Sequence, residues 1–395
     1  MFNGKHILMI VENLPAPFDR RVWQEANTLA ANGAKVSIIC PKMKGYMKSF
    51  ETINGIDIYR HPLYIEAKGA LGYVLEYANA LVWEFMLGWW IFFRKRFDVV
   101  FGCNPPDLIF LVALTFRPFG VKFIFDHHDI NPELYFAKYR KKDLMYRFLL
   151  YLERLTFSTA DFSIATNESY REIAITRGKM PPERIGVIRS GPNLDRLKPA
   201  PGNDKYKKGR NYLVGYVGVI GAQEGLDLLL DSIRLIVHKR RDVQFAIIGD
   251  GTELVNIIKK TRAMGLHDYV DYYGRVDDAT MVDVLSTADV CVNPDRPTEM
   301  NNLSTMNKIM EYMALKKPIV QYDLKEGRFS ADQASLYASN TSTADFADKI
   351  IWLLDHPEDR ISRGEYGYHK VVNELSWDHE SRKLVDFFKK VFSCR

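Results

Sequence analysis

Glu311 lies in a segment whose residue types could bind a diphosphate and a sugar. The segment NKIMEYMALKKPIVQYD, residues 307–323, predicts a polar-headed helix followed by an apolar strand. A helix that begins after residues 301–305 presents free backbone N–H groups and the positive end of its dipole, which suit a diphosphate. Glu311 would lie roughly two turns further in, where its carboxylate can accept hydrogen bonds from sugar hydroxyls. Together these features indicate half of a nucleotide-sugar site.

Asp19, Arg20 and Arg21 follow the first predicted strand. The planar fork of arginine suits phosphate, so the pair indicates an acceptor that carries a phosphate or diphosphate group. The alternative is a helix cap made by Asp19, with both arginines on a solvated first turn. We expect all three residues to contact the acceptor.

Two adjacent histidines, His127 and His128, lie between Asp126 and Asp129 at the end of another predicted strand. Neighbours on an extended strand point to opposite sides, so the two cannot easily ligate one ion, and we expect no metal. One of the two histidines could instead be a core residue. Asp129 and Glu133 are candidate acceptor contacts or a local base.

The composition indicates a globular, two-domain protein. With 395 residues, of which 47% are hydrophobic, the chain can bury a core in each domain. Its four cysteines show no CxxC spacing and three of them lie in apolar runs, which favours a reducing cytoplasm. The first residues lead directly into a strand without a signal-peptide pattern, so we expect no export.

The charge is uneven: the first 200 residues carry an excess of seven positive charges and the rest an excess of two negative ones, which gives the net +5. A basic first half fits a phosphate-bearing partner or an anionic membrane, although solubility alone is the commoner reason.

Residues 71–93 are apolar, but Glu76 and Glu84 leave too short an uncharged run to cross a bilayer. Segments 85–96 and 138–150 mix aromatic and basic residues, which predicts contact with an anionic membrane surface, with a core helix as the alternative for the first. We expect a cytoplasmic protein bound peripherally to the inner face of the cell membrane, and no nucleic-acid partner.

Short apolar runs alternate with helical patterns along the whole chain, which predicts two parallel sheets with helices on both faces. Strands are expected near residues 6–12, 35–40, 56–61, 99–103, 122–126, 162–166 and 185–189, and again near 213–219, 244–249, 270–273, 290–293, 318–322 and 336–337. The fold class is therefore α/β, with two Rossmann-like domains. Neither half has GxGxxG after its first strand, which counts against a nicotinamide dehydrogenase.

Four segments follow from this pattern: a first Rossmann-like domain at 1–191, a linker at 192–210, a second Rossmann-like domain at 211–376 and a last helix at 377–395 that could return to the first domain. Proline, glycine and charge are expected to exclude regular structure from the linker. Ligands of such sheets bind at the carboxyl ends of the strands, so the site is expected in the cleft between the domains.

Five motifs resemble those of retaining GT-B glycosyltransferases of family 4, especially bacterial enzymes of surface polysaccharides and lipid-linked sugars. They are PFDRRVWQEA at 17–26, DHHD at 126–129, GPN at 191–193, IGDG at 248–251 and NKIMEYMA at 307–314. The resemblance covers essentially the whole chain. The resemblance implies a second domain that binds a nucleotide-sugar, expected to be UDP-linked, and a first domain that binds a lipid-linked or saccharide acceptor.

The resemblance also implies site residues. Glu311 matches the second glutamate of a paired-glutamate motif, which holds the nucleotide ribose, and His127 or His128 matches a histidine that contacts the donor sugar; these are the candidate catalytic residues. The other donor-site candidates lie in loops after strands and around the start of the Glu311 helix: Gly218, Gly221, Gly249, Gly251, Arg275, Asp295, Glu299, Ser304, Thr305, Met306, Asn307 and Lys308.

The chain departs from the family pattern at the first glutamate, whose position is Leu303. Asp295, Glu299 or Asn302 could hold the hydroxyls of the donor sugar instead, Glu299 only if residues 300–303 loop out.

The loop 218–225 also departs, since it lacks the usual Arg and Lys and carries Glu224. Phosphate binding would then rely on glycine amides, on the helix end at Ser304 and on Lys308 or Arg275.

Enzymes of this kind retain anomeric configuration without a covalent enzyme intermediate, because the leaving diphosphate accepts the proton of the acceptor. We therefore expect no dedicated nucleophile, no metal and no other cofactor. The alternatives are a UDP-sugar 2-epimerase of the same fold and a non-catalytic module that binds nucleotide or glycan.

Overall fold

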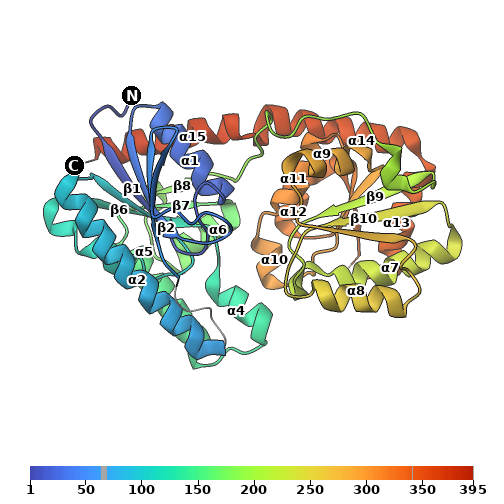
Figure 1. The fold of residues 1–395 in the computed structure, drawn as a ribbon, viewed down its shortest axis with the longest axis horizontal. Coiled ribbons are helices and arrows are strands. Elements are labelled where there is room, and N and C mark those ends of the chain that lie inside the picture. Colours follow the sequence, from blue (N-terminus) through green and yellow to red (C-terminus); the bar gives the residue numbers. More distant parts are fainter. Residues whose placement is uncertain (64–68, 340, 395) are drawn as a thin grey trace. The chain divides into compact units, whose positions relative to one another are not determined.

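The chain folds into two compact units, each built on a parallel β-sheet with helices on both faces (Figure 1). The structure is a computed structural model that describes residues 1–63, 69–339 and 341–394, without the side chains of 69–76. The first unit comprises Met1–Ser190 and Glu380–Arg395, and the second unit comprises Gly191–His379. The predicted α/β class with two parallel-sheet domains is confirmed.

The first unit contains an eight-stranded sheet of order β3-β4-β2-β1-β5-β6-β7-β8. The strands are β1 His6–Val11, β2 Lys35–Pro41, β3 Phe50–Ile53, β4 Ile56–His61, β5 Val99–Cys103, β6 Lys122–His127, β7 Phe162–Ala165 and β8 Ile185–Val187. The helices are α1 Arg20–Ala31, α2 Gly69–Arg94, α3 Phe110–Leu114, α4 Asn131–Tyr139, α5 Leu144–Thr159 and α6 Glu168–Thr176, with 3-10 turns η1 Arg117–Phe119 and η2 Pro182–Arg184. All pairs are parallel except β3 with β4.

The second unit contains a six-stranded, all-parallel sheet of order β11-β10-β9-β12-β13-β14. The strands are β9 Tyr212–Val217, β10 Val243–Ile248, β11 Val270–Gly274, β12 Val290–Asn293, β13 Ile319–Tyr322 and β14 Ser335–Ala338. The helices are α7 Leu226–Lys239, α8 Leu254–Ala263, α9 Asp278–Thr287, α10 Glu299–Leu303, α11 Asn307–Ala314, α12 Lys325–Ala331, α13 Thr343–Asp355 and α14 Pro357–Lys370, with shorter turns η3 Asp204–Lys207, η4 Ala222–Glu224, η5 Asp332–Ala334 and η6 Val371–Leu375.

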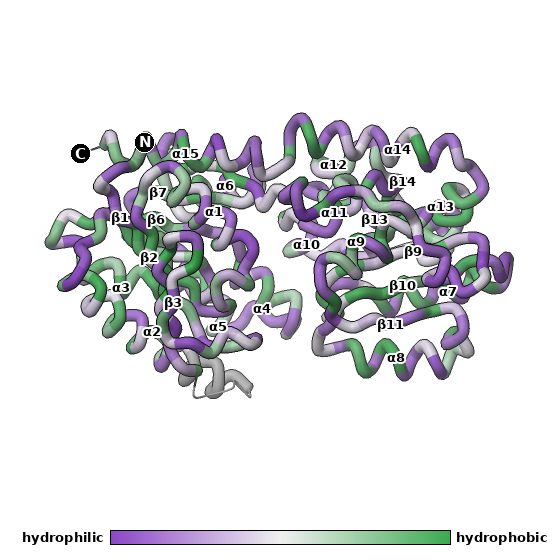
Figure 2. The backbone as a smooth tube through the Cα atoms, turned by 45° about the horizontal axis from the view of Figure 1, so that its top comes forward, coloured by the Kyte–Doolittle hydropathy of each residue, from purple (hydrophilic) through white to green (hydrophobic). Residues whose placement is uncertain are grey.

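The strands form where apolar runs can be buried on both sides. All six residues of β1 and all six of β10 are buried, as expected when helices cover both faces of a parallel sheet. Figure 2 shows the apolar colour concentrated along the central strands of each unit. The carboxyl ends of neighbouring strands therefore lie at one edge of each sheet, where the polar residues of the loops gather.

The last helix, α15 Trp377–Ser393, joins the core of the first unit from Glu380 onward. Phe388 is fully buried with its ring 5.8 Å from that of Phe101, and Phe387 lies 5.9 Å from Phe162. Gly186 in β8 leaves room for Phe387, since a Cβ there would lie 2.7 Å from its ring. An amphipathic helix at this place completes the core of the first unit.

Two local features differ from the expectations: strand β3 was not predicted, and the segment 192–210 contains the 3-10 turn η3. Residues 299–303 form the short helix α10, so the condition under which Glu299 could replace the first glutamate, a loop at 300–303, is not met. Thr298 caps α10, because its hydroxyl oxygen accepts a hydrogen bond from the Asn301 N–H at 3.2 Å.

Candidate functional site

Helix α11 begins at Asn307 without a side-chain cap on its first turn. Its predecessor Met306 is extended and half-buried, and Asn307 is exposed. The buried face of α11 anchors it: the Tyr312 hydroxyl accepts from the Val217 N–H at 2.9 Å. A rigid helix whose amino-terminal N–H groups receive no side-chain oxygen is the arrangement that an anionic ligand can complete.

Lys308 does not present an unpaired charge. Its ammonium donates to Asp295 Oδ1 at 2.8 Å and to Asn293 Oδ1 at 3.2 Å, and it lies 5.1 Å from the centre of the Tyr216 ring. Asp295 is buried, so it requires this cation. Lys308 is thus already paired within the unit, and its contact with the diphosphate stays a prediction.

Glu311 is held by an arginine that the sequence did not single out. Arg196 donates to Glu311 Oε1 at 2.6 Å and to Asp278 Oδ1 at 2.9 Å. Glu311 is 13% exposed in its side chain, so it remains accessible beside this partner. Arg196 lies in the predicted linker, 115 residues away in the chain, where no periodic pattern signals a contact.

The glycines of the two loops after β9 and β10 are required by the packing of these loops against each other. A Cβ on Gly249, where φ is +141°, would lie 1.8 Å from the Gly218 carbonyl oxygen, and a Cβ on Gly251 would lie 2.4 Å from that of Ile220. The Ile220 N–H donates to the Asp250 oxygen at 3.0 Å. These glycines are therefore required by contacts between the two loops, and their role as donor-site residues stays a prediction.

Glu224 stabilises its own loop in place of the lysine usual in the family. The Gly221 N–H donates to Glu224 Oε2 at 3.1 Å. Burial and the nearby carboxylate of Asp295 raise the pKa of Glu224 to about 7, against the opposing effect of Lys308. This loop therefore offers a carboxyl group where the family pattern has a cation.

The remaining donor-site candidates differ in exposure. Arg275 follows β11 and is exposed, as is Glu299 at the start of α10. Ser304 donates its hydroxyl to the Met300 oxygen at 2.8 Å, and both Ser304 and Thr305 are half-buried. Asn302 accepts the Lys325 N–H at 2.8 Å. Glu299, Asn302, Ser304 and Thr305 precede α11 directly in the chain, whereas Arg275 follows β11 in the same unit.

In the first unit, Arg21 is buried in a network of charges. Its guanidinium binds both oxygens of Asp126, with Nε–Oδ2 3.0 Å and Nη2–Oδ1 2.7 Å, and Nη2 lies 3.0 Å from Glu25 Oε1. Burial would raise the pKa of Asp126, but the charges of Arg21 and His128 bring it well below its usual range. This geometry contradicts the predicted role of Arg21 as an acceptor-phosphate ligand, because its buried guanidinium is already paired with the Asp126 carboxylate. Burial raises the pKa of the neighbouring Glu25 to about 8.

His128 is the histidine of the pair that reaches the surface. Its Nδ1 lies 3.2 Å from Asp126 Oδ2, at an angle outside that of a hydrogen bond, and the side chain is 11% exposed. Burial lowers the affinity of the ring for a proton, but Asp126 dominates and raises the pKa of His128 to about 9. Nδ1 is buried beside Asp126, so the 11% of the His128 side chain that is exposed belongs to other atoms of the side chain.

His127 is a core residue, as the alternative interpretation predicted for one of the pair. It is fully buried, with its ring about 5 Å from those of Phe125, Phe157 and Tyr170. Burial, with smaller effects from two nearby cations, lowers its pKa to about 3. The Glu153 carboxylate is 3.9 Å away, but the neutral ring makes no ion pair. The alternation of side chains along β6 separates the two histidines, as predicted for strand neighbours.

Asn104 fixes the turn that carries His128, and sequence reasoning missed it. Its side-chain oxygen accepts the N–H groups of His128 at 2.9 Å and Asp129 at 3.0 Å, and its amide donates to the Asp129 oxygen at 2.6 Å. A lone asparagine after a strand gives no signal of this role.

The other acceptor candidates separate into structural and accessible groups. Glu133 is buried and accepts from Arg177 at 2.5 Å, which explains it as a structural ion pair. Asp19 caps α1 by accepting the Val22 N–H at 3.1 Å, as the alternative interpretation predicted. Arg20 is exposed, and burial raises the pKa of Asp129 to about 6. The predicted role of Glu133 is corrected, whereas Arg20 and Asp129 remain candidates.

Within the described residues, Glu25, Cys103 and Asp126 bring potential metal ligands within 4.8 Å of one another. The Arg21 guanidinium lies against both carboxylates, and burial raises the pKa of the Cys103 thiol. In this cluster the Arg21 guanidinium therefore takes the position of a cation beside the two carboxyl groups.

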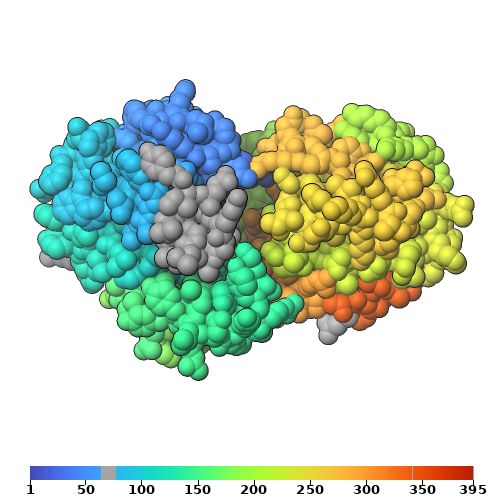
Figure 3. Space-filling view, turned by 60° about the horizontal axis from the view of Figure 1, so that its bottom comes forward, coloured from blue at the N-terminus to red at the C-terminus, as the bar shows by residue number. Residues whose placement is uncertain are grey.

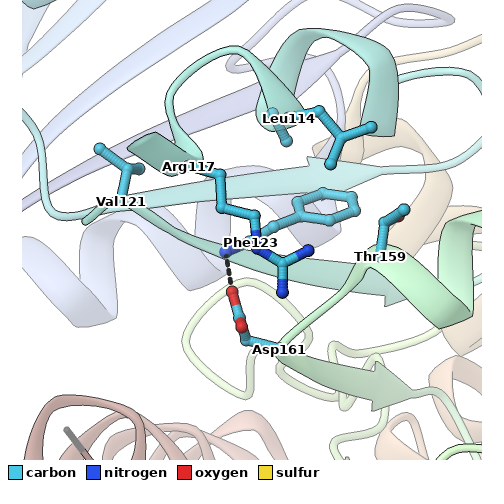
Figure 4. A pocket seen from close by; sticks show the side chains of 7 residues that line it. Leu114, Arg117, Val121, Phe123, Thr159 and Asp161 are labelled. Atoms are coloured by element: carbon cyan, nitrogen blue, oxygen red, sulfur yellow. Dashed lines mark hydrogen bonds between the residues drawn. The ribbon is translucent and has the colours of Figure 1, made fainter. Parts of the chain in front are cut away.

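A small hollow lies at the opposite edge of the first sheet, lined by Ala113, Leu114, Arg117, Val121, Phe123, Thr159 and Asp161 (Figure 4). Its volume of about 10 Å³ corresponds to no more than a single water molecule. Asp161 accepts the Phe123 N–H there at 2.8 Å. The hollow lies where β6 begins, away from the Asp126–Asp129 turn, and is too small for a sugar.

Comparison with known proteins identifies the family of both units. Residues 19–196 match the family described as Glycosyltransferase Family 4, and residues 211–356 match Glycosyl transferases group 1. The phosphatidyl-myo-inositol mannosyltransferase of Mycobacterium leprae is 30% identical over 212 residues, which cover 52% of this chain and 53% of that relative. The chain spans about half the length of the curated relatives it matches.

Solved structures share the fold along the whole chain. A sucrose-phosphate synthase from Thermosynechococcus elongatus has a TM-score of 0.82 at 17% identity and covers 99% of this chain and 100% of that one. Anabaena HepE in complex with UDP and glucose has a TM-score of 0.73 at 13% identity, with 97% and 99% covered. At these identities the likeness shows the fold alone.

Proposed function

We propose that this chain, which belongs to the GT-B glycosyltransferases of family 4 type, transfers a sugar from a UDP-sugar to a lipid-linked or saccharide acceptor in cell-surface glycan synthesis, with retention of configuration. The observation that carries the proposal is the start of α11, which has no side-chain cap and lies one turn before Glu311. The UDP and glucose bound to HepE and the lipid acceptor in the name of the mycobacterial relative support this choice of substrates.

The residues of the chain would act by binding and charge stabilisation. The amides and the dipole at the start of α11 would stabilise the diphosphate as it leaves, and Glu311 would hold the ribose. The bond from the anomeric carbon to the diphosphate oxygen breaks, the acceptor oxygen bonds to the same face, and its proton passes to the diphosphate. His128, kept cationic by Asp126, would donate to the sugar. No step requires a metal or another cofactor.

A thermal-shift screen with UDP, GDP and ADP sugars tests the donor, and mass spectrometry of the products tests transfer. We expect stabilisation by a UDP-sugar and release of UDP in the presence of an acceptor. Glu311→Ala should abolish the stabilisation, while Glu365→Ala serves as the matched control, because it removes a half-buried glutamate of α14 that pairs with Lys316. Stabilisation by none of the nucleotide-sugars would refute the proposal.

The same experiment separates the two alternatives. An epimerase would interconvert UDP-sugars without any acceptor, and a binding module would be stabilised by UDP without releasing sugar under any condition. Both outcomes would contradict transfer while leaving nucleotide binding intact.

We further propose that the first unit lies on an anionic membrane surface on the cytoplasmic side. In α2, Phe85, Met86, Trp90 and Phe93 are 43%, 54%, 43% and 79% exposed, and the Arg94 guanidinium stacks 3.8 Å from the centre of the Trp90 ring. Glu84 is fully buried on the other side of the helix, where burial raises its pKa to about 8. The helix thus has an inner and an outer face. A core position for one face is therefore compatible with the proposed membrane contact of the other.

The second segment, 138–150, repeats this surface on α4 and α5. Leu144 and Phe148 are 81% and 51% exposed, and Lys142 lies 4.9 Å from the ring centre of Phe136. Figure 3 shows α2 in light blue and α4–α5 in green on one face of the first unit. No helix in the described part of the chain is long and apolar enough to cross a bilayer. Exposed aromatic side chains beside cations suit an anionic headgroup layer.

Co-sedimentation with phosphatidylglycerol vesicles tests this surface. Wild-type protein should sediment at low salt, less so at high salt, and not with phosphatidylcholine vesicles. Trp90→Ala with Phe93→Ala and Arg94→Gln should remain in the supernatant, while the control Trp352→Ala, which truncates an exposed tryptophan of the second unit, should not. Trp89 is left unchanged because it packs 4.8 Å from Phe116. Equal sedimentation of all variants would exclude this surface.

A further inference from the structure

Two buried side chains at the carboxyl end of β12 carry polar atoms that the second unit does not satisfy. Asn293 is 0% exposed and Asp295 is 1% exposed. One oxygen of each accepts from the Lys308 ammonium, at 3.2 Å and 2.8 Å. The other atoms, Asn293 Nδ2 and Asp295 Oδ2, have no hydrogen-bond partner in the described residues.

Such atoms destabilise a folded protein, because each has lost its hydrogen bonds to water without gaining others. Both lie around the same ammonium group, so they form one small neighbourhood. It contains an amide donor and a carboxylate acceptor. A hydroxyl group, which accepts one hydrogen bond and donates another, matches this pair.

The other candidates for the missing glutamate are accounted for. Leu303 ends α10 and carries no polar group, and Asn302 uses its side-chain oxygen to accept the Lys325 N–H at 2.8 Å. Glu299 is exposed at the start of α10. Because residues 299–303 form this helix, they do not form the loop that would bring Glu299 inward. Asp295 is therefore the candidate whose carboxylate is buried and incompletely paired.

On the premise of the proposed function, we propose that Asn293 and Asp295, oriented by Lys308, bind hydroxyl groups of the donor sugar in place of the first glutamate of the family. The charge of this subsite selects among sugars. Asp295 and the neighbouring Glu224 contribute two carboxyl groups against one ammonium, so the subsite accepts a neutral sugar and disfavours a uronic acid.

Isothermal titration of the full chain with UDP, UDP-glucose, UDP-N-acetylglucosamine and UDP-glucuronate tests the assignment. Wild-type protein should bind a neutral UDP-sugar more tightly than UDP, and UDP-glucuronate at least about tenfold more weakly than that sugar. Asn293→Leu, which keeps the volume and removes the donor, should weaken the neutral UDP-sugar about tenfold and change the affinity for UDP by no more than about twofold. Asn293→Ala should give the same pattern.

The melting temperature separates this role from a structural one. Asn293→Leu removes an unsatisfied buried donor but also the oxygen that accepts from Lys308, so the two effects oppose each other and we expect it to melt close to wild type. Equal weakening of UDP and of the UDP-sugar, or no weakening of either, would overturn the assignment, as would a preference for UDP-glucuronate. Wild-type protein that binds neither UDP nor any UDP-sugar would instead refute the proposed function itself.

Discussion

Replacing His127 with phenylalanine should leave the enzyme active and make its stability less sensitive to acid. The ring lies among Phe125, Phe157 and Tyr170, so a phenyl ring of similar shape fits the same space. Neither ring nitrogen has a hydrogen-bond partner in the described residues, so the substitution removes no interaction. At neutral pH we expect the variant to be at least as stable as wild type.

The acid dependence follows from the lowered pKa. The unfolded histidine titrates near 6.5 and the folded one at about 3, so the unfolded state binds a proton first as the pH falls. Stability is fully present above pH 6.5 and is lost as the pH falls toward the folded value. At about 1.4 kcal/mol per pH unit, roughly 2 kcal/mol is lost through His127 by about pH 5.

Urea unfolding of both proteins at about pH 7.5 and about pH 5 measures this difference. The variant should lose roughly 2 kcal/mol less than wild type between the two conditions, and its turnover should match that of wild type. Equal losses would mean that the ring is hydrated or already charged in the folded state. A folded His127→Phe variant without activity would show that this residue, and not His128, serves the reaction.

Three further outcomes are expected. Arg177→Met should lower the free energy of unfolding by about 3–5 kcal/mol in urea titrations, because it strands two buried glutamates, and a loss below about 1 kcal/mol would contradict the buried ion pairs. Arg196→Gln should weaken UDP more than 2′-deoxy-UDP in titration calorimetry, since Arg196 orients the Glu311 carboxylate toward the ribose; equal weakening would exclude that role. Wild-type stability should decline as the pH rises above 6.5 toward about 9, where His128 loses its proton, and His128→Phe should remove that part of the decline in unfolding experiments.

The fold was predictable because its strands are buried on both sides. Apolar runs bounded by turns located β5 and β12 to the residue. The missed strand β3 is short, half-exposed and antiparallel, but Asn54-Gly55, both with positive φ, is a strong hairpin signal between β3 and β4 that could have revealed it.

The site was less predictable, because burial and pairing decide what a charged residue does. The motif around residues 19–21 suggested free arginines, yet Arg21 is paired inside the unit with Asp126. The partner of Glu311 comes from a segment without pattern, and only the alternation along β6 distinguishes His127 from its neighbour. Residue types indicated the kind of ligand, whereas the assignment of roles required the contacts.

The position of α15 at the end of the chain has a consequence for synthesis. The ribosome completes the whole second unit before the residues that cover Phe101 and Phe162 emerge, so the nascent first unit has an open apolar groove for much of translation. Leu384, Phe388 and Val391 then close it, each fully buried. A nonsense mutation or proteolytic trimming near Glu380 would therefore damage the amino-terminal half of the protein.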